Sequence, residues 1–294
     1  MEAAPPEAPL RLPSRSPFAI DTLFSFLAAR AVPGVEEVRD GRYRRSVHMT
    51  DGRSAVIALT PKRIDGQVVV DVSAEPMPAK DALAPAVRRA LDLDASPREI
   101  DATLARDPRL APLVTRTPGI RVPGTFDVFE LVVRAIFGQQ VSVSGARTSL
   151  GRFAARFGAP VDRPVGSITR LFPVPGQVAE IPLEAFGMPR RRAETIHRVA
   201  ELAARLDLDL SGNASPTETI ERLSQVRGIG PWTLAYVAMR GLRDPDAFLA
   251  GDLGVRRGFD ALGLPSTTKE ILERAERWRP WRAYAVMHLW HASP

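Results

Sequence analysis

The spacing of hydrophobic positions divides the chain into a mixed first part and a helical second part. Residues 20–31 repeat apolar side chains at helical spacing, which predicts an amphipathic helix with Leu23, Phe26 and Leu27 on one face. Three segments are strand-like, and the Asp-Gly pairs between them are typical of short hairpin turns; the strands are 42–49, 53–59 and 67–74, and the turns are 51–52 and 65–66. A helix over 80–93 follows, in which Pro85 must lie in the first turn or kink the helix.

After a loop rich in proline and glycine at 116–125, the pattern becomes helical and no further strand is predicted. The helices are expected at 126–138, 141–157, 189–206, 216–224, 231–241, 253–262, 267–277 and 279–292. The predicted fold class is therefore α+β, with an antiparallel sheet and helices in an N-terminal domain at 17–120 and an all-α domain at 121–294. Residues 1–16 are rich in proline and lack periodicity, which favours a disordered segment or a linker.

One stretch of the helical part, residues 223–252, carries the strongest chemical signal. Gly228 and Gly230 separate two helical patterns, and Pro231 is suited to the first position of the second helix because its missing amide hydrogen would have no partner there. Such a hairpin directs free backbone amides and the positive end of a helix dipole outward, which suits a phosphate. Asp252 follows 22 positions after Gly230. This spacing favours a DNA-phosphate anchor with a carboxylate held at a fixed distance from it.

Composition narrows the class of partner and excludes several cofactors. The chain has 294 residues, a formal net charge of +6 and a sequence pI near 10.4, which favours an anionic partner such as nucleic acid. With no cysteine, disulfides, thiolate zinc sites and cysteine-held iron–sulfur clusters are excluded, and with only four histidines a histidine-rich metal site is not expected. No apolar run is long enough to span a bilayer and the start lacks a secretory apolar region, so a cytoplasmic location is expected.

Each candidate side chain also has a purely structural interpretation. Asp252 is suited to capping the helix that begins at residue 253, and from the residues alone the cap is the better explanation. Trp232, Tyr236 and Trp290 are of types that most often fill cores, although the first two lie four positions apart on one face of the helix that follows the hairpin. Trp278 and Trp281 have no such argument and are assigned structural roles.

Two polar groups flank predicted helix starts. Gln139 and Gln140 stand at a helix boundary, where their amides either satisfy backbone groups or enter a groove of DNA. The run of three arginines at 190–192 is typical of a solvated helix start or a phosphate contact.

Several long segments in a fixed order resemble the AlkA-type DNA-3-methyladenine glycosylases of the helix-hairpin-helix, glycine-proline-aspartate superfamily. They lie at 25–38, 129–158, 186–196, 226–254 and 275–290. The resemblance implies an N-terminal domain of TATA-binding-protein-like fold before a helix-hairpin-helix domain. It implies that Asp252 is catalytic and that Trp232, Tyr236, Trp290 and, less directly, Phe26 form walls of a base pocket. It also implies DNA contacts at Gly228, Ile229, Gly230, Gln139 and Gln140.

The resemblance further implies a monovalent cation, Na⁺ or K⁺, held by the backbone carbonyls of Ser224, Val226 and Ile229, with no other cofactor required. Two positions depart from family patterns. Gln140 stands where a well-studied member inserts a leucine into the gap left by a flipped base. Trp232 stands where members that also cleave the strand carry a lysine nucleophile.

The sequence therefore predicts a monomeric, bacterial-type, nucleoid-associated glycosylase that acts without strand cleavage. It is expected to flip alkylated purines out of double-stranded DNA and excise them hydrolytically in base excision repair. Two alternatives stay open at this point: a non-catalytic protein that binds damaged DNA, and a glycosylase specialised for deaminated or oxidised bases.

Overall fold

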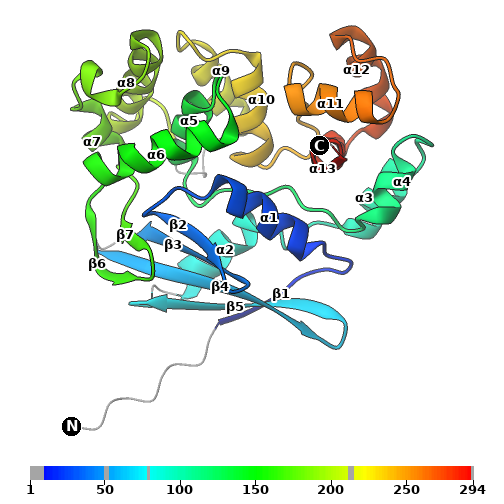
Figure 1. Cartoon of the computed structure of the whole chain (residues 1–294), viewed down its shortest axis with the longest axis horizontal. Coiled ribbons are helices and arrows are strands. Elements are labelled where there is room, and N and C mark those ends of the chain that lie inside the picture. The colour runs from blue at the N-terminus through cyan, green and yellow to red at the C-terminus, as the bar shows by residue number, and fades with distance from the viewer. Residues whose placement is uncertain (1–9, 50–52, 78–79, 211–214, 293–294) are drawn as a thin grey trace.

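In the computed structural model, an antiparallel sheet lies beneath a layer of helices (Figure 1). The structure describes residues 10–49, 53–77, 80–210 and 215–292. The strands are β1 (Leu10–Pro13), β2 (Glu36–Arg39), β3 (Arg42–His48), β4 (Ser54–Ile64), β5 (Gln67–Glu75), β6 (Pro160–Val165) and β7 (Ile168–Arg170). The first helices are α1 (Ile20–Arg30), α2 (Lys80–Ala90), α3 (Pro97–Leu104), α4 (Ala111–Arg116), α5 (Val128–Phe137) and α6 (Val143–Phe157). The remaining helices are α7 (Pro175–Ala179), η1 (Leu183–Phe186), α8 (Arg190–Ala204), α9 (Pro216–Ser224), α10 (Pro231–Arg240), α11 (Leu253–Ala261), α12 (Thr268–Ala275), η2 (Glu276–Trp278) and α13 (Arg282–Ala292).

Five strands form the main sheet in the order β1-β5-β4-β3-β2, with every neighbouring pair antiparallel. The three strands predicted at 42–49, 53–59 and 67–74 are confirmed, although β4 extends to Ile64. Asp65 and Gly66 both have positive φ, of 49° and 76°, as a two-residue hairpin between twisted strands requires. The turn predicted at Asp51-Gly52 lies outside the described residues.

The start of the described chain belongs to this sheet. Leu10–Pro13 pairs with Val69–Val72 of β5, and Leu12 is 5% exposed. The prediction of a disordered or linker segment is therefore wrong for the strand residues of 1–16, because tertiary pairing supplies an order that a short proline-rich segment does not signal. Residues 1–9 lie outside the described part of the chain.

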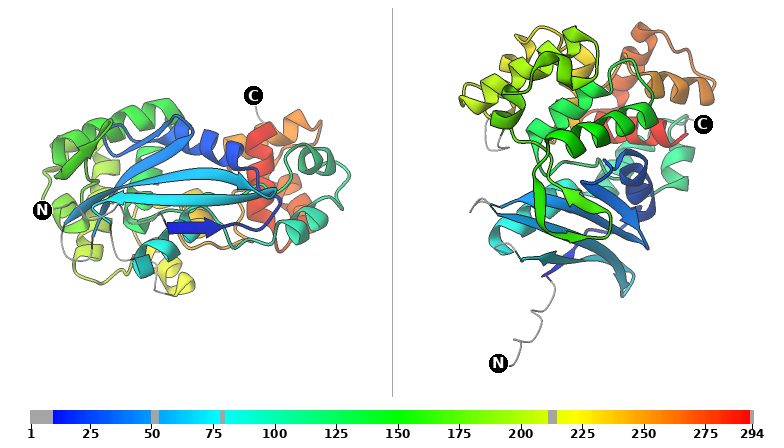
Figure 2. Two further views of the ribbon diagram at one scale, coloured as in Figure 1. Left: turned by 90° about the horizontal axis from the view of Figure 1, so that it is seen from below. Right: turned by 60° about the vertical axis from the view of Figure 1, so that its left-hand side comes forward.

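A second correction concerns the region after residue 125, where no strand was expected. β6 and β7 form a hairpin beside β3 and β4, and Val161 and Ile168 pack on Val56 of the sheet (Figure 2). The second part of the chain is thus not purely helical. Pro160, Pro164 and the charged pair at 162–163 interrupt the alternation that marks a strand, and prolines are tolerated here because the pairing is short and irregular.

The eight predicted helices after residue 125 are all present, within two or three residues of their expected bounds. Several begin at side chains that cap them: Asp127 accepts a hydrogen bond from the Glu130 amide, and Thr267 forms a reciprocal capping box with Glu270. Helix α2 begins at Lys80, so Pro85 lies in its second turn rather than its first.

Two helical clusters above the sheet hold the site. One cluster joins α5, α6, α8, α9 and α10. The other joins α11, α12 and α13 to α3 and α4, two helices that the hydrophobic pattern did not predict. Helices α3 and α4 precede residue 120 in sequence, yet Ile100, Leu104 and Leu113 pack among the C-terminal helices. None of the described helices is long and apolar enough to cross a membrane.

Candidate active site at the helix hairpin

The hairpin between α9 and α10 has the backbone geometry that its glycines indicated. Gly228 has a φ of +95°, and a β-carbon there would lie 2.1 Å from Oγ1 of the buried Thr195. Gly230 caps α10, and Pro231 is the first residue of that helix. The turn is thus fixed against α8 and leaves the first amides of α10 without intrahelical partners.

Gln139 contacts this hairpin from the end of α5. Its amide nitrogen donates to the carbonyl of Gly228 at 3.1 Å and to the hydroxyl of Thr233 at 3.2 Å. Its own carbonyl accepts a hydrogen bond from Arg192 at 3.0 Å. The Gln139 amide is therefore engaged in holding the hairpin in this structure.

Gln140 occupies a different environment from its neighbour. It is exposed, with a φ of +59°, and the following Val141 and Val143 are 43% and 46% exposed. The loop therefore presents one amide and two apolar side chains to solvent at the start of α6. The arginines at 190–192 differ in their surroundings. Arg190 pairs with Glu194 at 2.9 Å, whereas Arg191 is exposed.

Asp252 caps α11 as predicted, and it has two further donors. Its Oδ1 accepts from the Val255 amide at 2.9 Å and from Nε1 of Trp290 at 2.7 Å. Its Oδ2 accepts from Nε1 of Trp232 at 2.8 Å. The carboxylate is therefore fixed by one backbone amide and two indole groups, which come from α10 and α13.

The four predicted aromatic residues meet at one place although they come from three helices. Trp232 stacks on Tyr236 with centroids 5.1 Å apart, and Phe26 of α1 stacks on Trp290 of α13 at 6.0 Å. Tyr236 and Trp290 lie 6.5 Å apart and join the two pairs. These side chains are half-buried, and Trp232 and Trp290 both donate to Asp252, so sequence-distant segments converge on one carboxylate.

Two arginines that the sequence reasoning missed also lie in this cluster. The Cζ atom of Arg30 lies 3.7 Å from the Phe26 ring centroid, and that of Arg240 lies 5.0 Å from the same ring and 5.3 Å from Tyr236. Each follows an aromatic residue by four positions on its helix, a spacing that places the two side chains side by side. That spacing is the signal that would have revealed them.

The arginines perturb the groups around them. Burial lowers the pKa of Arg30, and the charge of Arg240 adds to that effect. Burial acts to raise the pKa of Tyr236, but the charges of Arg240 and Arg30 outweigh it and lower that pKa below its ordinary value. Arg240 donates to the Tyr236 hydroxyl and to the carbonyls of Pro123 and Gly124.

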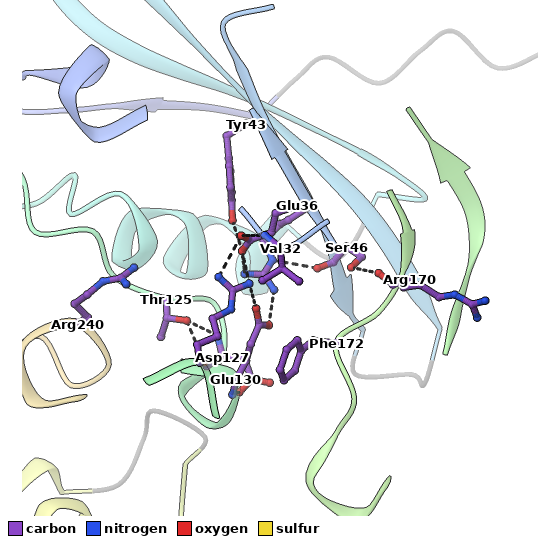
Figure 3. Close-up of polar contacts among 12 residues, drawn as sticks. Val32, Glu36, Tyr43, Ser46, Thr125, Asp127, Glu130, Arg170, Phe172 and Arg240 are labelled. Carbon is purple, nitrogen blue, oxygen red and sulfur yellow. Dashed lines mark hydrogen bonds and ion pairs between the residues drawn. The ribbon is translucent and has the colours of Figure 1, made fainter. Parts of the chain in front are cut away.

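A buried ion cluster joins the sheet to α5 (Figure 3). Arg45 pairs with Glu36 at 3.2 Å and with Glu130 at 2.7 Å, and Arg134 pairs with both carboxylates. The Tyr43 hydroxyl donates to Glu36 at 2.9 Å. Burial acts to raise the pKa of Glu36, but the charges of Arg134 and Arg45 lower it to about 2.

The carbonyls expected to hold a cation lie at the hairpin. The Ile229 amide donates to the Val226 carbonyl at 3.1 Å, which leaves that oxygen one lone pair. Among the described turn contacts, the carbonyls of Ser224 and Ile229 accept no backbone hydrogen bond. Neutral carbonyl oxygens suit a monovalent cation, so the donor set fits such an ion. Within the described residues, no group of three or more His, Cys, Asp or Glu side chains could hold a metal.

The two tryptophans assigned structural roles have partners other than Asp252. Trp278 is 1% exposed and its Nε1 donates to Asp107 at 2.9 Å, while Trp281 packs edge-on against Tyr284.

The fold and the site together define a helix-hairpin-helix protein with an α+β N-terminal domain and a fixed carboxylate beside the hairpin. Two family models match the chain: the AlkA N-terminal domain over residues 9–127, and the HhH-GPD superfamily base excision DNA repair protein over residues 133–283. The chain belongs to the HhH-GPD superfamily of base excision DNA repair proteins and carries an AlkA-type N-terminal domain. The resemblance inferred from the sequence is thereby confirmed.

Similar proteins agree with this assignment. A probable bifunctional transcriptional activator/DNA repair enzyme AlkA of Mycobacterium tuberculosis is 42% identical over 96% of this chain and 56% of its own length. The chain thus spans little more than half of that relative. DNA-3-methyladenine glycosylase 2 of Escherichia coli is 34% identical over 94% of this chain and 95% of its own length.

A solved structure shares the fold over almost the whole chain. The 3-methyladenine DNA-glycosylase from Archaeoglobus fulgidus has a TM-score of 0.83 at 24% identity, covering 96% of this chain and 97% of the other.

Proposed function

We propose that this protein is a DNA glycosylase that excises alkylated purines of the 3-methyladenine type from double-stranded DNA in base excision repair. The observation that carries the proposal is Asp252, fixed by Val255, Trp232 and Trp290 beside a helix hairpin. The full-length relative in Escherichia coli is named for the same activity, which supports the assignment.

The proposed reaction begins with rotation of the damaged nucleotide out of the duplex, which costs a few kcal/mol and least for weakly paired bases. The amides of Gly228 and Gly230 then hold a phosphate, because neither has a partner among the described turn contacts and both lie at the positive end of α10. The carbonyls of Ser224, Val226 and Ile229 would hold a monovalent cation, which would supply positive charge beside that phosphate. The aromatic faces of Phe26, Tyr236, Trp232 and Trp290 offer stacking surfaces for the base.

Asp252 would act on the sugar rather than on the base. As the glycosidic bond breaks, positive charge develops at the sugar, and a carboxylate held at a fixed point stabilises it. The two indole donors and the Val255 amide fix the carboxylate before the reaction starts, so it does not have to reorganise in the transition state. An alkylated purine leaves without being protonated, so one carboxylate suffices.

Base removal without strand cleavage follows from the residue two positions after Gly230. Strand-cleaving chemistry needs an amine that forms a Schiff base with the sugar, and Trp232 offers an indole instead. We therefore propose a monofunctional hydrolase that acts as a monomer and leaves an abasic site.

The experiment that tests this function compares the wild type with Asp252→Asn on methylated duplex DNA under single-turnover conditions. Asparagine keeps the cap and the shape but removes the charge and the acceptor for Trp232, so base release is expected to fall by about 100-fold or more. Asp127→Asn is the matched control, because Asp127 caps α5 in the same way at 3.0 Å and lies on another element.

Three readouts separate the outcomes. Retained binding of Asp252→Asn to abasic-site DNA with lost base release supports a catalytic role. Equal release by the variant and the wild type contradicts the mechanism, and no release by either favours a non-catalytic damage-binding protein. Nicking of the DNA strand by the wild type contradicts the monofunctional assignment.

A further inference from the structure

The aromatic faces of the candidate base pocket already face two guanidinium groups. Arg30 lies over Phe26 at 3.7 Å and within 6.0 Å of Trp290, while Arg240 lies 5.0 Å from Phe26 and 5.3 Å from Tyr236. A planar cation thus covers one face of the Phe26 ring. The attraction of these rings for a positive charge is satisfied before any DNA binds.

These two charges have little compensation. Among the described residues, neither Arg30 nor Arg240 forms an ion pair with a carboxylate, and the acceptors of Arg240 are two backbone carbonyls and the Tyr236 hydroxyl. Within this cluster, the two guanidinium groups accompany one carboxylate, that of Asp252, which Trp232 and Trp290 already bind.

This balance treats the two chemical classes of lesion differently. A purine alkylated on a ring nitrogen enters as a cation, so both guanidinium groups repel it. A neutral base with carbonyl or ring-nitrogen acceptors, such as a deaminated purine, is not repelled and can accept hydrogen bonds from Arg30. Arg30 has no hydrogen-bond partner among the described contacts, so its donors are available.

The bond-breaking step strengthens the difference. When a neutral base departs, the electron pair of the glycosidic bond moves onto the base, the oxygen of water bonds to C1′, and the proton of water ends on the base. Negative charge on the departing base is therefore a feature of that transition state, and a guanidinium beside it is stabilising. When a cationic base departs, the electron pair neutralises it, the water oxygen again bonds to C1′, and a proton is released to solvent. No negative charge develops on that base for Arg30 to stabilise.

We propose that Arg30 is a specificity-determining residue that favours neutral, acceptor-bearing bases over cationic alkylated bases. The proposal rests on the glycosylase function proposed above: Arg30 sets how fast neutral bases are released relative to the alkylated purines that the same site excises. Arg240 donates to two backbone carbonyls and contributes a fixed positive charge. Arg30 lies over the Phe26 ring, where it can contact the base.

The test measures single-turnover release of free base from two duplexes of one sequence, one containing 7-methylguanine and one containing hypoxanthine. Replacing Arg30 by methionine, an apolar side chain of similar length, is expected to raise the ratio of the 7-methylguanine rate to the hypoxanthine rate by about tenfold or more. Arg205→Met, which changes an exposed arginine at the end of α8, is the matched control and is expected to leave the ratio unchanged.

Arg30→Lys guards against a folding defect in the methionine variant. Lysine keeps the charge but loses the planar fork, so it is expected to retain the penalty on 7-methylguanine while hypoxanthine release falls. An unchanged ratio in Arg30→Met, or equal losses on both duplexes, overturns the proposal. If the wild type releases neither base, the glycosylase function itself fails; if it releases both and only the ratio is insensitive to Arg30, this inference alone fails.

Discussion

The two indole N–H groups that hold Asp252 provide the sharpest test of how this site works. Trp232→Phe keeps a ring next to Tyr236 but removes the donor that lies 2.8 Å from Oδ2, and Trp290→Phe does the same at 2.7 Å from Oδ1. In each variant the carboxylate keeps the Val255 amide and one indole. Its position is then less tightly fixed, although its charge and the aromatic walls are preserved.

The size of the effect follows from the geometry. A hydrogen bond to a charged acceptor contributes about 1.5–3 kcal/mol, and misplacing a reacting group by about 1 Å can cost about 100-fold in rate. We therefore expect either phenylalanine variant to lower the single-turnover rate by about 10- to 100-fold. Affinity for abasic-site DNA is expected to stay within about twofold, because the hairpin is unchanged.

The assay is release of free base from methylated duplex DNA at saturating protein, with thermal unfolding measured in parallel. Trp278→Phe is the matched control, since its indole donates to the buried Asp107 at 2.9 Å away from the site. That variant is expected to lose stability but not rate. If Trp232→Phe and Trp290→Phe keep the wild-type rate while Trp278→Phe is destabilised, the indole groups do not position Asp252 and the reasoning is refuted.

Two further predictions concern the ion cluster and the hairpin. The pKa of Glu36, about 2 in the folded protein against an ordinary value of 4.5, lies below its unfolded value, so its contribution is complete above about pH 4.5 and is lost as the pH falls toward 2. Denaturant unfolding at several pH values is expected to show that the free energy of unfolding of the wild type falls by about 3 kcal/mol over this range, whereas Glu36→Gln lacks this loss. The same pH dependence of the unfolding free energy in both proteins would contradict the prediction. Gly228→Ala places a β-carbon 2.1 Å from Oγ1 of Thr195 at a φ of +95°, so affinity for abasic-site DNA is expected to fall at least about tenfold, whereas Gly251→Ala, which has open space for its β-carbon, is expected to bind normally.

The parts of the fold that the sequence predicted correctly depend on short-range sequence patterns. The hairpin, the first residue of α10 and the cap at Asp252 each depend on residues within a few positions of one another, so glycine, proline and aspartate in the right order were sufficient. Strand β6 was not predicted, because its prolines and charged residues interrupt the alternating pattern of a strand. Its pairing depends on contacts with the neighbouring sheet.

Long-range convergence accounts for what the sequence could not provide. The resemblance placed Trp232 and Trp290 on the walls of a pocket, but their indole groups face Asp252, and this depends on how α10, α11 and α13 pack. The proximity of Arg30 to Arg240 depends likewise on α1 meeting α10. Periodicity reports which face of a helix is apolar, and not which distant helix will cover that face.

The buried ion cluster bears on how freely the two halves of this protein can be exchanged in evolution. Arg45 and Glu36 belong to the N-terminal family segment, whereas Glu130 lies between the two matched segments and Arg134 lies in the second. A recombinant that joined one member's sheet to another's helices would have to match all four charges, because one buried charge without its partner costs about 3–5 kcal/mol. Each half of the protein thus depends on charges that the other half supplies.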